Sequence, residues 1–267
     1  MKLSELHVID LFSGIGGFSL GLHQADSRFK TIAFCEIDPF CQKVLKKNFP
    51  EVKIYGDIKK TTFTEPAFLV CGGFPCQSIS IAGKQRGKDD DRWRFPQMLR
   101  VIKEVKANWI IAENVQNLLN IADGEILQGI YNDLESLDYE VQTFRISAAS
   151  QGAWHKRERV WIVAHTDSTS NGKNDVPDSS IKRLQGYRFS SNLENEKHKT
   201  QKSTKRDIKE QQNWWQTVAK ICGVPNGVQY GLDKDQSKRI KALGNAIVPQ
   251  IITELGKAII KAEFNDG

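Results

Sequence analysis

The chain has 267 residues, of which 39% are hydrophobic and 26% charged, as is typical of a globular protein with one large domain, or a large and a small one. It has no run of about 18 apolar residues, which excludes a membrane-spanning helix. The five cysteines are odd in number and lack CxxC spacing, so we expect neither a disulfide framework nor a metal site. Its first residues show no secretory leader, and we expect a cytoplasmic protein.

The net charge of +6 is concentrated in one region of the chain. Residues 166–241 hold fifteen Lys or Arg against nine Asp or Glu, whereas the other residues hold twenty-three of each. A regional basic excess is typical of a surface that faces a polyanion such as nucleic acid. A solvated insert would carry the same charge, so composition alone leaves both interpretations open.

Short apolar runs alternate with amphipathic stretches through the first 165 residues. The apolar runs predict strands at 6–12, 31–37, 68–73, 109–115, 139–147 and 159–166. The amphipathic stretches predict helices at 19–25, 38–49, 95–107 and 126–137. This alternation predicts an α/β fold with a doubly wound, mostly parallel, Rossmann-like sheet. Ligands of such sheets bind at the carboxyl ends of the strands.

The rest of the chain differs in composition. Residues 166–213 are polar and charged and cannot form much core alone, while 239–262 ends in an amphipathic helix. We therefore expect a core at 1–165, a small basic module at 166–238, and a closing segment at 239–267 that returns to the core.

The segment DLFSGIGG (10–17) is predicted to lead from the first strand into a helix through a glycine-rich turn. Its glycines let a ligand approach the backbone, with the N-terminus of the helix behind it. Glu36, about 20 residues further on, stands where an acidic residue accepts hydrogen bonds from ribose hydroxyls. Asp57 ends a third segment and could accept one from an exocyclic amine. The turn is not the GxGxxG of dinucleotide sites, so S-adenosylmethionine suits this set; capping of surface helices by the two carboxylates is the alternative.

Cys76 follows the strand predicted at 68–73, within the sequence GGFPC. The glycines open an approach to it, and Pro75 fixes a backbone dihedral just before the sulfur. Exposure and a fixed direction are what a nucleophilic thiolate needs, whereas Cys71, inside the strand, suits a packing role. Cys76 is therefore the candidate nucleophile.

Three charged side chains could assist this thiolate. Glu113 ends the strand predicted at 109–115, would open onto the same edge of the sheet, and could hydrogen-bond a ring nitrogen. Arg157 and Arg159 alternate at the start of the last predicted strand, so both point the same way and could hold a carbonyl oxygen or a phosphate. Each arginine taken alone could equally be a surface residue.

Eight segments, in chain order, closely resemble the motif series of the C5-cytosine DNA methyltransferases. They are DLFSGIGGFSLGL, CEID, GDI, GGFPCQSIS, RW.F, AENV, RER and LGNAIVPQ. The resemblance implies a DNA (cytosine-5-)-methyltransferase that moves a methyl group from S-adenosylmethionine to C5 of a cytosine flipped out of duplex DNA, leaving S-adenosylhomocysteine. It also implies that 1–165 is the cofactor-binding catalytic domain and 166–238 the target-recognition module.

The resemblance further implies roles for individual residues. Cys76 would add to C6 of the base, and Glu113 would contact N3 and the exocyclic amine. Arg159, with Arg157 in the same motif, would lie on the O2 side. The cofactor would be surrounded by Phe12, Ser13, Gly14, Ile15, Gly16, Gly17, Glu36, Ile37, Asp57, Ile58, Pro75, Phe95, Asn245 and Ala246.

A substrate loop and partners follow from the same resemblance. The loop starts with Gln77, Ser78 and Ser80 and would close over the extruded base. His155 stands where the family usually has glutamine. Double-stranded DNA would be the partner, with no membrane. A cognate restriction endonuclease of a restriction–modification system could accompany the protein without being required for activity. We expect a monomer that is nucleoid-associated in a prokaryotic or phage-infected cell.

Other activities explain the motifs less well. A cysteine hydrolase would need a histidine paired with Cys76, and no histidine shows such a signature; a nicotinamide dehydrogenase would need GxGxxG. Two nearer alternatives stay open. One is a transfer-RNA cytosine-5 methyltransferase of the same fold, and the other is a non-catalytic nucleic-acid-binding relative, which would have no use for a nucleophile.

Overall fold

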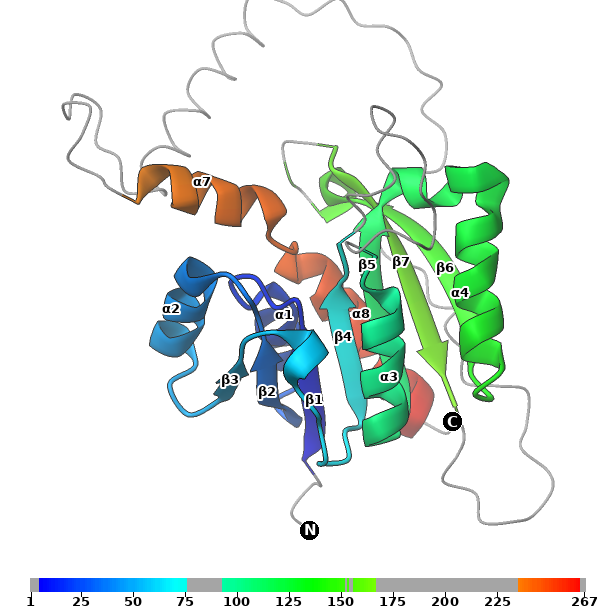
Figure 1. Cartoon of the computed structure of the whole chain (residues 1–267), viewed down its shortest axis with the longest axis horizontal. Helices are drawn as coiled ribbons and strands as arrows, with labels where there is room; N and C mark the ends of the chain where they lie inside the picture. The colour runs from blue at the N-terminus through cyan, green and yellow to red at the C-terminus, as the bar shows by residue number, and fades with distance from the viewer. Residues whose placement is uncertain (1–4, 76–92, 152, 154–155, 167–234, 265–267) are drawn as a thin grey trace, which may run out of the picture. The chain divides into compact units, whose positions relative to one another are not determined.

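The computed structural model describes residues 5–75, 93–151, 153, 156–166 and 235–264. Within these ranges a seven-stranded sheet has the order β3-β2-β1-β4-β5-β7-β6 (Figure 1). The strands are β1 (Leu6–Leu11), β2 (Phe29–Cys35), β3 (Lys53–Tyr55), β4 (Leu69–Gly73), β5 (Trp109–Val115), β6 (Glu140–Ser147) and β7 (Glu158–His165). The first five strands of the chain pair in parallel, and β7 pairs antiparallel with both β5 and β6. The predicted α/β fold with a mostly parallel sheet is confirmed.

Helices connect the strands and cover both faces of this sheet (Figure 1). In the described residues the α-helices are α1 (Gly17–Ala25), α2 (Pro39–Asn48), α3 (Phe95–Val105), α4 (Glu125–Glu135), α7 (Gln236–Asn245) and α8 (Pro249–Phe264). The short 3-10 helices are η1 (Ile58–Lys60), η4 (Gln116–Leu119), η5 (Ile121–Gly124) and η6 (Ala148–Gln151).

Successive side chains of a strand point to opposite faces of the sheet, and each face has its own hydrophobic core. Val8 of β1 and Trp161 of β7 belong to the core that α1 and α8 cover. Their neighbours Ile9 and Ile162 belong to the core that α3 and α4 cover. Because both faces are buried, the central strands are almost continuous apolar runs, which is why the sequence predicts them well.

The helix α8 packs along α1, although the two lie at opposite ends of the chain. Thr253 Oγ1 of α8 donates to the Gly21 carbonyl of α1 at 3.1 Å. Gly21 also permits the close approach, because a Cβ there would lie 2.5 Å from the Pro249 carbonyl oxygen and 2.6 Å from Ile252 Cβ. The end of the chain is therefore part of the same core as the first strand.

Some element boundaries differ from the prediction. The second strand begins at Phe29, two residues earlier than the apolar run that predicted it. The strand β3 has three exposed or half-buried residues, too short and too polar a segment to be detected as an apolar run. The amphipathic helix expected at the end of 239–262 is α8, which begins at Pro249. The helix α7 was not predicted separately, and the extended residue Ala246 ends it.

The chain divides into two compact units, Met1–Ser191 with Ile247–Gly267, and Asn192–Ala246. In the second unit the structure describes α7 and the residues next to its ends. The expected division at 1–165, 166–238 and 239–267 stays a prediction, since residues 167–234 lie outside the described ranges. Among the helices that the structure describes, none has the length and apolar character needed to cross a membrane.

Candidate active site

The glycine-rich turn between β1 and α1 has a left-handed backbone. Phe12 (φ 52°), Gly14 (φ 55°) and Gly16 (φ 89°) lie in the region that favours glycine. At Gly16 the surrounding space is filled, because a Cβ would lie 2.7 Å from the ring of Phe49. At Gly14 it is open, since no atom of the described residues lies within 4 Å of a Cβ placed there. Within the part of the chain that the structure describes, the turn therefore leaves room for a ligand beside the backbone of Gly14.

The other residues of this turn fasten it to its surroundings. Ser13 is buried; its amide donates to the Cys35 carbonyl at 3.2 Å, and its Oγ accepts from the Cys35 amide at 3.2 Å. Gly17 begins α1 and lies against Ile247, whose carbonyl oxygen would be 2.8 Å from a Cβ at this position. Ile15 is half-buried. The turn is thus held by β2 on one side and by Ile247, just before α8, on the other.

Glu36 joins the same turn to the start of α2. Its two carboxylate oxygens accept hydrogen bonds from the amides of Gly14 and Asp38, both at 2.7 Å. Burial raises the pKa of Glu36, and these amide hydrogen bonds oppose the rise. The N-cap of α2 is Asp38, whose carboxylate accepts from the Phe40 amide at 2.8 Å. Glu36 is therefore not the cap of that helix, and it fixes the edge of the glycine-rich turn.

The next residues along this edge combine polar and apolar character. Ile37 is 70% exposed, an unusual position for a large apolar side chain, and offers a surface on which a planar ring can pack. Asp57 accepts from the Lys59 amide at 2.9 Å and so caps η1, as the alternative interpretation of this residue expected. Ile58 beside it is buried, and so is Phe95, whose ring centroid lies 5.5 Å from that of Phe74.

Glu113 of β5 and Arg159 of β7 form an ion pair further along the same edge of the sheet. Arg159 Nε lies 3.0 Å from Glu113 Oε1, and the side chains are 23% and 12% exposed, respectively. Burial raises the pKa of Glu113, while the charges of Arg159 and Arg157 oppose the rise. Arg157 directly precedes β7 and has a φ of 21°. Burial and the charge of Arg159 lower the pKa of Arg157, and the charge of Glu113 opposes this effect. The predicted carboxylate and both predicted arginines therefore interact with one another.

Asn114 is a buried polar residue of this edge that the sequence analysis does not assign. Its side chain is 2% exposed; Nδ2 donates to the Phe74 carbonyl at 3.0 Å and Oδ1 accepts from the Val115 amide at 2.8 Å. Phe74 lies two residues before Cys76 in the chain, and half-buried Pro75 stands between them. Asn114 thus fixes the backbone that leads to the candidate nucleophile. A polar residue beside Glu113 in an otherwise apolar strand was the signal that could have revealed it.

Asp10, within the motif DLFSGIGG, is a second residue that was not assigned. It is fully buried, and burial raises its pKa to about 8, opposed by a hydrogen bond from Ser19. Ser19 Oγ donates to Asp10 Oδ2 at 2.8 Å, and Thr31 Oγ1 donates to Ser19 Oγ at 2.8 Å. A single acidic residue inside an apolar strand was the available signal, because such a group is buried with few partners.

Several predicted residues cannot be compared with the structure. Those outside the described residues are Cys76, Gln77, Ser78, Ser80 and His155. Asn245 ends α7 and Ala246 caps it, so both belong to the second unit. The roles of all seven stay predictions. Among the described side chains, no group of three or more His, Cys, Asp or Glu could hold a metal ion.

The described residues place two kinds of chemistry at one edge of the sheet. The turn at Gly14, with Glu36, Ile37 and Asp57, can hold a ligand that carries a ribose and an amine-bearing ring. Glu113 and the arginines provide a buried acid and positive charge for a substrate with ring nitrogens and a carbonyl oxygen.

Comparison with known proteins assigns the family. The profile of the family described as C-5 cytosine-specific DNA methylase matches residues 6–222, more than half of the chain. The chain belongs to this family. The resemblance carried by the motif series is thereby confirmed.

Relatives of this chain include two type II methyltransferases. M1.ScrFI of Lactococcus lactis subsp. cremoris is 41% identical over 165 residues, which cover 61% of this chain and 42% of that protein. M.HhaI of Haemophilus parahaemolyticus is 36% identical over 165 residues, which cover 61% of this chain and 50% of that protein. The matched part of the chain thus spans half or less of the length of these relatives.

Two solved structures share the fold of this chain. The Dnmt2 methyltransferase of S. pombe matches with a TM-score of 0.64 and 17% identity, over 96% of this chain and 99% of that chain. A prophage-encoded DNA modification methyltransferase of E. coli matches with a TM-score of 0.63 and 19% identity, over 96% of this chain and 99% of that chain. Identities this low show the fold alone, which is the Rossmann-like α/β fold that the sequence predicted.

Proposed function

We propose that the chain is a DNA (cytosine-5-)-methyltransferase that uses S-adenosylmethionine and methylates a cytosine flipped out of duplex DNA. The observation that carries the proposal is the mostly buried pair of Glu113 and Arg159, which shares one sheet edge with the glycine-rich turn and Glu36. Membership of the methylase family and the names of the type II relatives support it.

The residues of the turn fit the proposed methyl donor. S-adenosylmethionine supplies a methyl group that is activated by a sulfonium and needs no phosphate site. Glu36 accepts two amide hydrogen bonds, and a carboxylate has about four acceptor positions, so ribose hydroxyls can still bind it. The Asp57 carboxylate also has about four acceptor positions, so it can cap η1 and still accept a hydrogen bond from the adenine amine. The exposed side chain of Ile37 would pack on the adenine ring.

The chemistry begins with addition of a thiolate to the base. The Cys76 thiolate forms a bond to C6, and the electron pair of the C5–C6 double bond shifts toward C5 and N3. Glu113, whose pKa is raised by burial, donates a hydrogen bond to N3 and stabilises this charge. Arg159 holds Glu113 in place and faces the O2 side, with Arg157 adding positive charge.

C5 has then become nucleophilic and would take the methyl group from the sulfonium of the donor. The S–CH3 bond breaks, and its electron pair stays on sulfur in the leaving S-adenosylhomocysteine. A base removes the C5 proton, its electron pair re-forms the C5–C6 double bond, and the C6–sulfur bond breaks to return the thiolate. Throughout these steps Asn114 holds the Phe74 carbonyl and with it the chain that leads to Cys76. The loop that begins with Gln77, Ser78 and Ser80 would exclude water by closing over the base.

Duplex DNA must release the base before this chemistry, at a cost of a few kcal/mol. We assign target recognition to the basic module at 166–238, catalysis to 1–165 and the return to the core to 239–267. We propose a monomer located in the cytoplasm and bound to DNA. A restriction endonuclease partner fits the type II relatives and is not needed for the reaction.

Methyl transfer can be tested with labelled S-adenosylmethionine, mixed-sequence duplex DNA, and the wild type beside Cys76→Ala and Cys41→Ala. We expect label in DNA with the wild type and with the buried-cysteine control Cys41→Ala, and none with Cys76→Ala. DNA containing 5-fluorocytosine should remain attached to the wild type in a denaturing gel, because fluorine at C5 blocks the final elimination. Equal label with and without Cys76 contradicts the proposal, and label in transfer RNA alone favours the RNA methyltransferase instead.

A further inference from the structure

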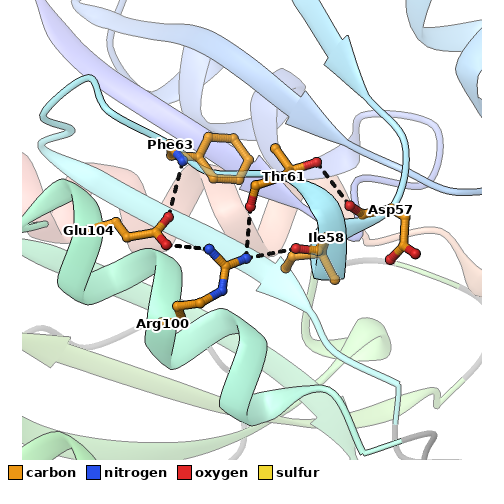
Figure 2. Close-up of polar contacts among 6 residues, drawn as sticks. All are labelled: Asp57, Ile58, Thr61, Phe63, Arg100 and Glu104. Atoms are coloured by element: carbon orange, nitrogen blue, oxygen red, sulfur yellow. Dashed lines mark hydrogen bonds and ion pairs between the residues drawn. The ribbon is translucent and has the colours of Figure 1, made fainter.

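Two charged residues of α3 clamp the segment that carries Asp57. Arg100 and Glu104 lie one turn apart on this helix, and Figure 2 shows both side chains directed at residues 57–63. Arg100 Nη2 donates to the Ile58 carbonyl at 2.7 Å and to the Thr61 carbonyl at 2.9 Å. The guanidinium therefore binds the beginning of η1 and the residue that follows it.

Glu104 completes the clamp from the other side. One of its oxygens accepts from Arg100 Nη1, and the other accepts from the Phe63 amide at 3.1 Å. Arg100 and Glu104 together form hydrogen bonds with two carbonyls and one amide of this segment (Figure 2). Arginine suits this position because its planar fork presents several donors in fixed directions, whereas lysine is a point charge on a flexible stem.

The clamped segment needs such support. It contains one short 3-10 helix, whose backbone hydrogen bonds are Lys60 to Asp57 at 3.0 Å and Thr61 to Ile58 at 3.4 Å. Single 3-10 turns have poor hydrogen-bond geometry and little stability of their own. Thr61 Oγ1 adds one contact to the Asp57 carbonyl at 2.9 Å. The rings of Phe63 and Tyr55 also pack together, with centroids 5.1 Å apart, and α3 supplies the hydrogen bonds to the Ile58 and Thr61 carbonyls and the Phe63 amide.

We infer that Arg100 is a positioning residue for the adenine end of the methyl-donor site. The inference rests on the proposed function, in which Asp57 accepts from the adenine amine. Figure 2 shows the Asp57 carboxylate turned away from the guanidinium, so Arg100 acts on it through the backbone of η1 and leaves the carboxylate to the ligand. Asp57 has the right direction only while Arg100 holds the Ile58 and Thr61 carbonyls.

The experiment compares two ligands that differ at the adenine amine. S-adenosylhomocysteine carries the amine, and S-inosylhomocysteine carries a carbonyl oxygen that repels the Asp57 carboxylate. Calorimetric titration of the wild type should show a preference for the first ligand of about tenfold, the size of a hydrogen bond to a charged group. Asp57→Ala should remove this preference, and Arg100→Met should reduce it to about twofold or less.

Three further variants separate positioning from general stability. The double variant Arg100→Met with Asp57→Ala should have the same preference as Asp57→Ala alone, because both changes remove one effect. Arg100→Lys keeps the charge without the fork and should also lose most of the preference. Arg28→Met is the matched control, since Arg28 is a partly buried arginine paired with Asp26 before β2; its ligand preference should equal that of the wild type.

Each outcome has a defined meaning. If Arg100→Met and Arg100→Lys weaken both ligands equally, or only lower the melting temperature, Arg100 is a structural residue and the inference is wrong. Arg100→Lys still decides the matter if Arg100→Met does not fold. A wild type that binds neither ligand contradicts the proposed function itself, which distinguishes that failure from the failure of the clamp.

Discussion

Glu113 Oε1 lies 3.0 Å from Arg159 Nε, across the antiparallel strands β5 and β7. The pair is mostly withdrawn from solvent, and burial raises the pKa of Glu113 more than the two arginines lower it. An acid that keeps its proton to higher pH can donate a hydrogen bond to a ring nitrogen under conditions where an exposed glutamate would be ionised. Pairing with Arg159 fixes the direction of the carboxyl group.

Glu113→Gln should lower the rate of methyl transfer by a factor of about 10² to 10⁴, the range for loss of a general acid. S-adenosylhomocysteine should bind as tightly as to the wild type. In the wild type the rate should fall as the pH rises through the pKa of Glu113, because the protonated form is the active one. The glutamine cannot ionise, so this alkaline decline should disappear. Single-turnover rates, measured as the pH is raised from 4.5, the ordinary pKa of a glutamate, provide the measurement.

Glu135→Gln is the control for this change, since Glu135 is exposed at the end of α4. It should leave both the rate and the pH profile unaltered. A Glu113→Gln protein that is as active as this control, with the same alkaline decline, would show that Glu113 has no role in proton transfer.

The sequence predicts the framework of this site because its features are local. A glycine-rich turn after an apolar strand, an acidic residue after the next strand and Pro75 before Cys76 can each be found without knowing which residues meet in space. Burial of the central strands on both faces makes them visible as apolar runs. The same reasoning leaves Asp57 undecided between ligand binding and capping, since both need a carboxylate at a helix start.

Residues that act through distant partners could not be predicted. Arg100 contacts the Ile58 and Thr61 carbonyls, about forty positions earlier in the chain. An arginine four residues before a glutamate in an amphipathic helix reads as an ordinary surface pair. Asn114 is similar, since its partner Phe74 directly follows another strand, β4. Only the order of strands in the sheet brings these groups together.

Asn114→Asp should slow methyl transfer more than it affects folding. The aspartate keeps an acceptor for the Val115 amide but has no donor for the Phe74 carbonyl, which then faces a second oxygen. Loss of one buried hydrogen bond costs about 1 to 3 kcal/mol of unfolding free energy. The backbone before Cys76 should lose its fixed direction, so the rate of adduct formation with 5-fluorocytosine DNA should fall at least tenfold, the equivalent of about 1.4 kcal/mol.

Asn132→Asp is the matched control, because Asn132 is an exposed asparagine on α4 that accepts from Gln128 at 2.9 Å. It should form the adduct at the wild-type rate. Melting temperatures recorded in parallel identify any variant that is unfolded in the assay. Wild-type adduct rates in a folded Asn114→Asp protein would show that the contact with Phe74 does not orient the nucleophile.

Asp10 should make the stability of the protein fall as the pH rises. In the unfolded chain its carboxyl ionises near the ordinary value of 3.8, whereas in the folded protein burial keeps it protonated up to about pH 8. Below pH 3.8 the carboxyl is protonated in both the folded and the unfolded protein, so its ionisation does not change the free energy of unfolding. Between the two values only the unfolded state releases the proton, so unfolding becomes more favourable by up to about 1.4 kcal/mol per pH unit.

Asp10→Asn removes this effect and keeps an oxygen to accept from Ser19 Oγ. Urea unfolding at pH 5 and pH 8 gives the measurement, with the difference in unfolding free energy between variant and wild type as the result. The unfolding free energy of the variant minus that of the wild type should be larger at pH 8 than at pH 5. Asp133→Asn, at an exposed position on α4, should show the same difference at both pH values. A pH-independent difference for Asp10→Asn would mean that Asp10 is ionised in the folded protein.

Gly21→Ala should destabilise the protein by separating α8 from α1. The added methyl group would lie 2.5 Å from the Pro249 carbonyl oxygen and 2.6 Å from Ile252 Cβ, and a backbone atom at the start of a helix cannot move aside as the end of a flexible side chain can. Forcing an extra carbon into a packed contact costs about 1 to 3 kcal/mol. An alanine in an open helical position has the opposite effect, because it favours the helix over glycine by about 1 kcal/mol.

Gly244→Ala provides that comparison, since no atom of the described residues lies within 4 Å of a Cβ on Gly244 in α7. Thermal unfolding should therefore show a lower melting temperature for Gly21→Ala, and an unchanged or higher one for Gly244→Ala. Because α1 begins directly after the glycine-rich turn, the Gly21→Ala protein should also bind S-adenosylhomocysteine more weakly at temperatures where it is still folded. Equal melting temperatures for the two variants would contradict the close contact of the first and last helices.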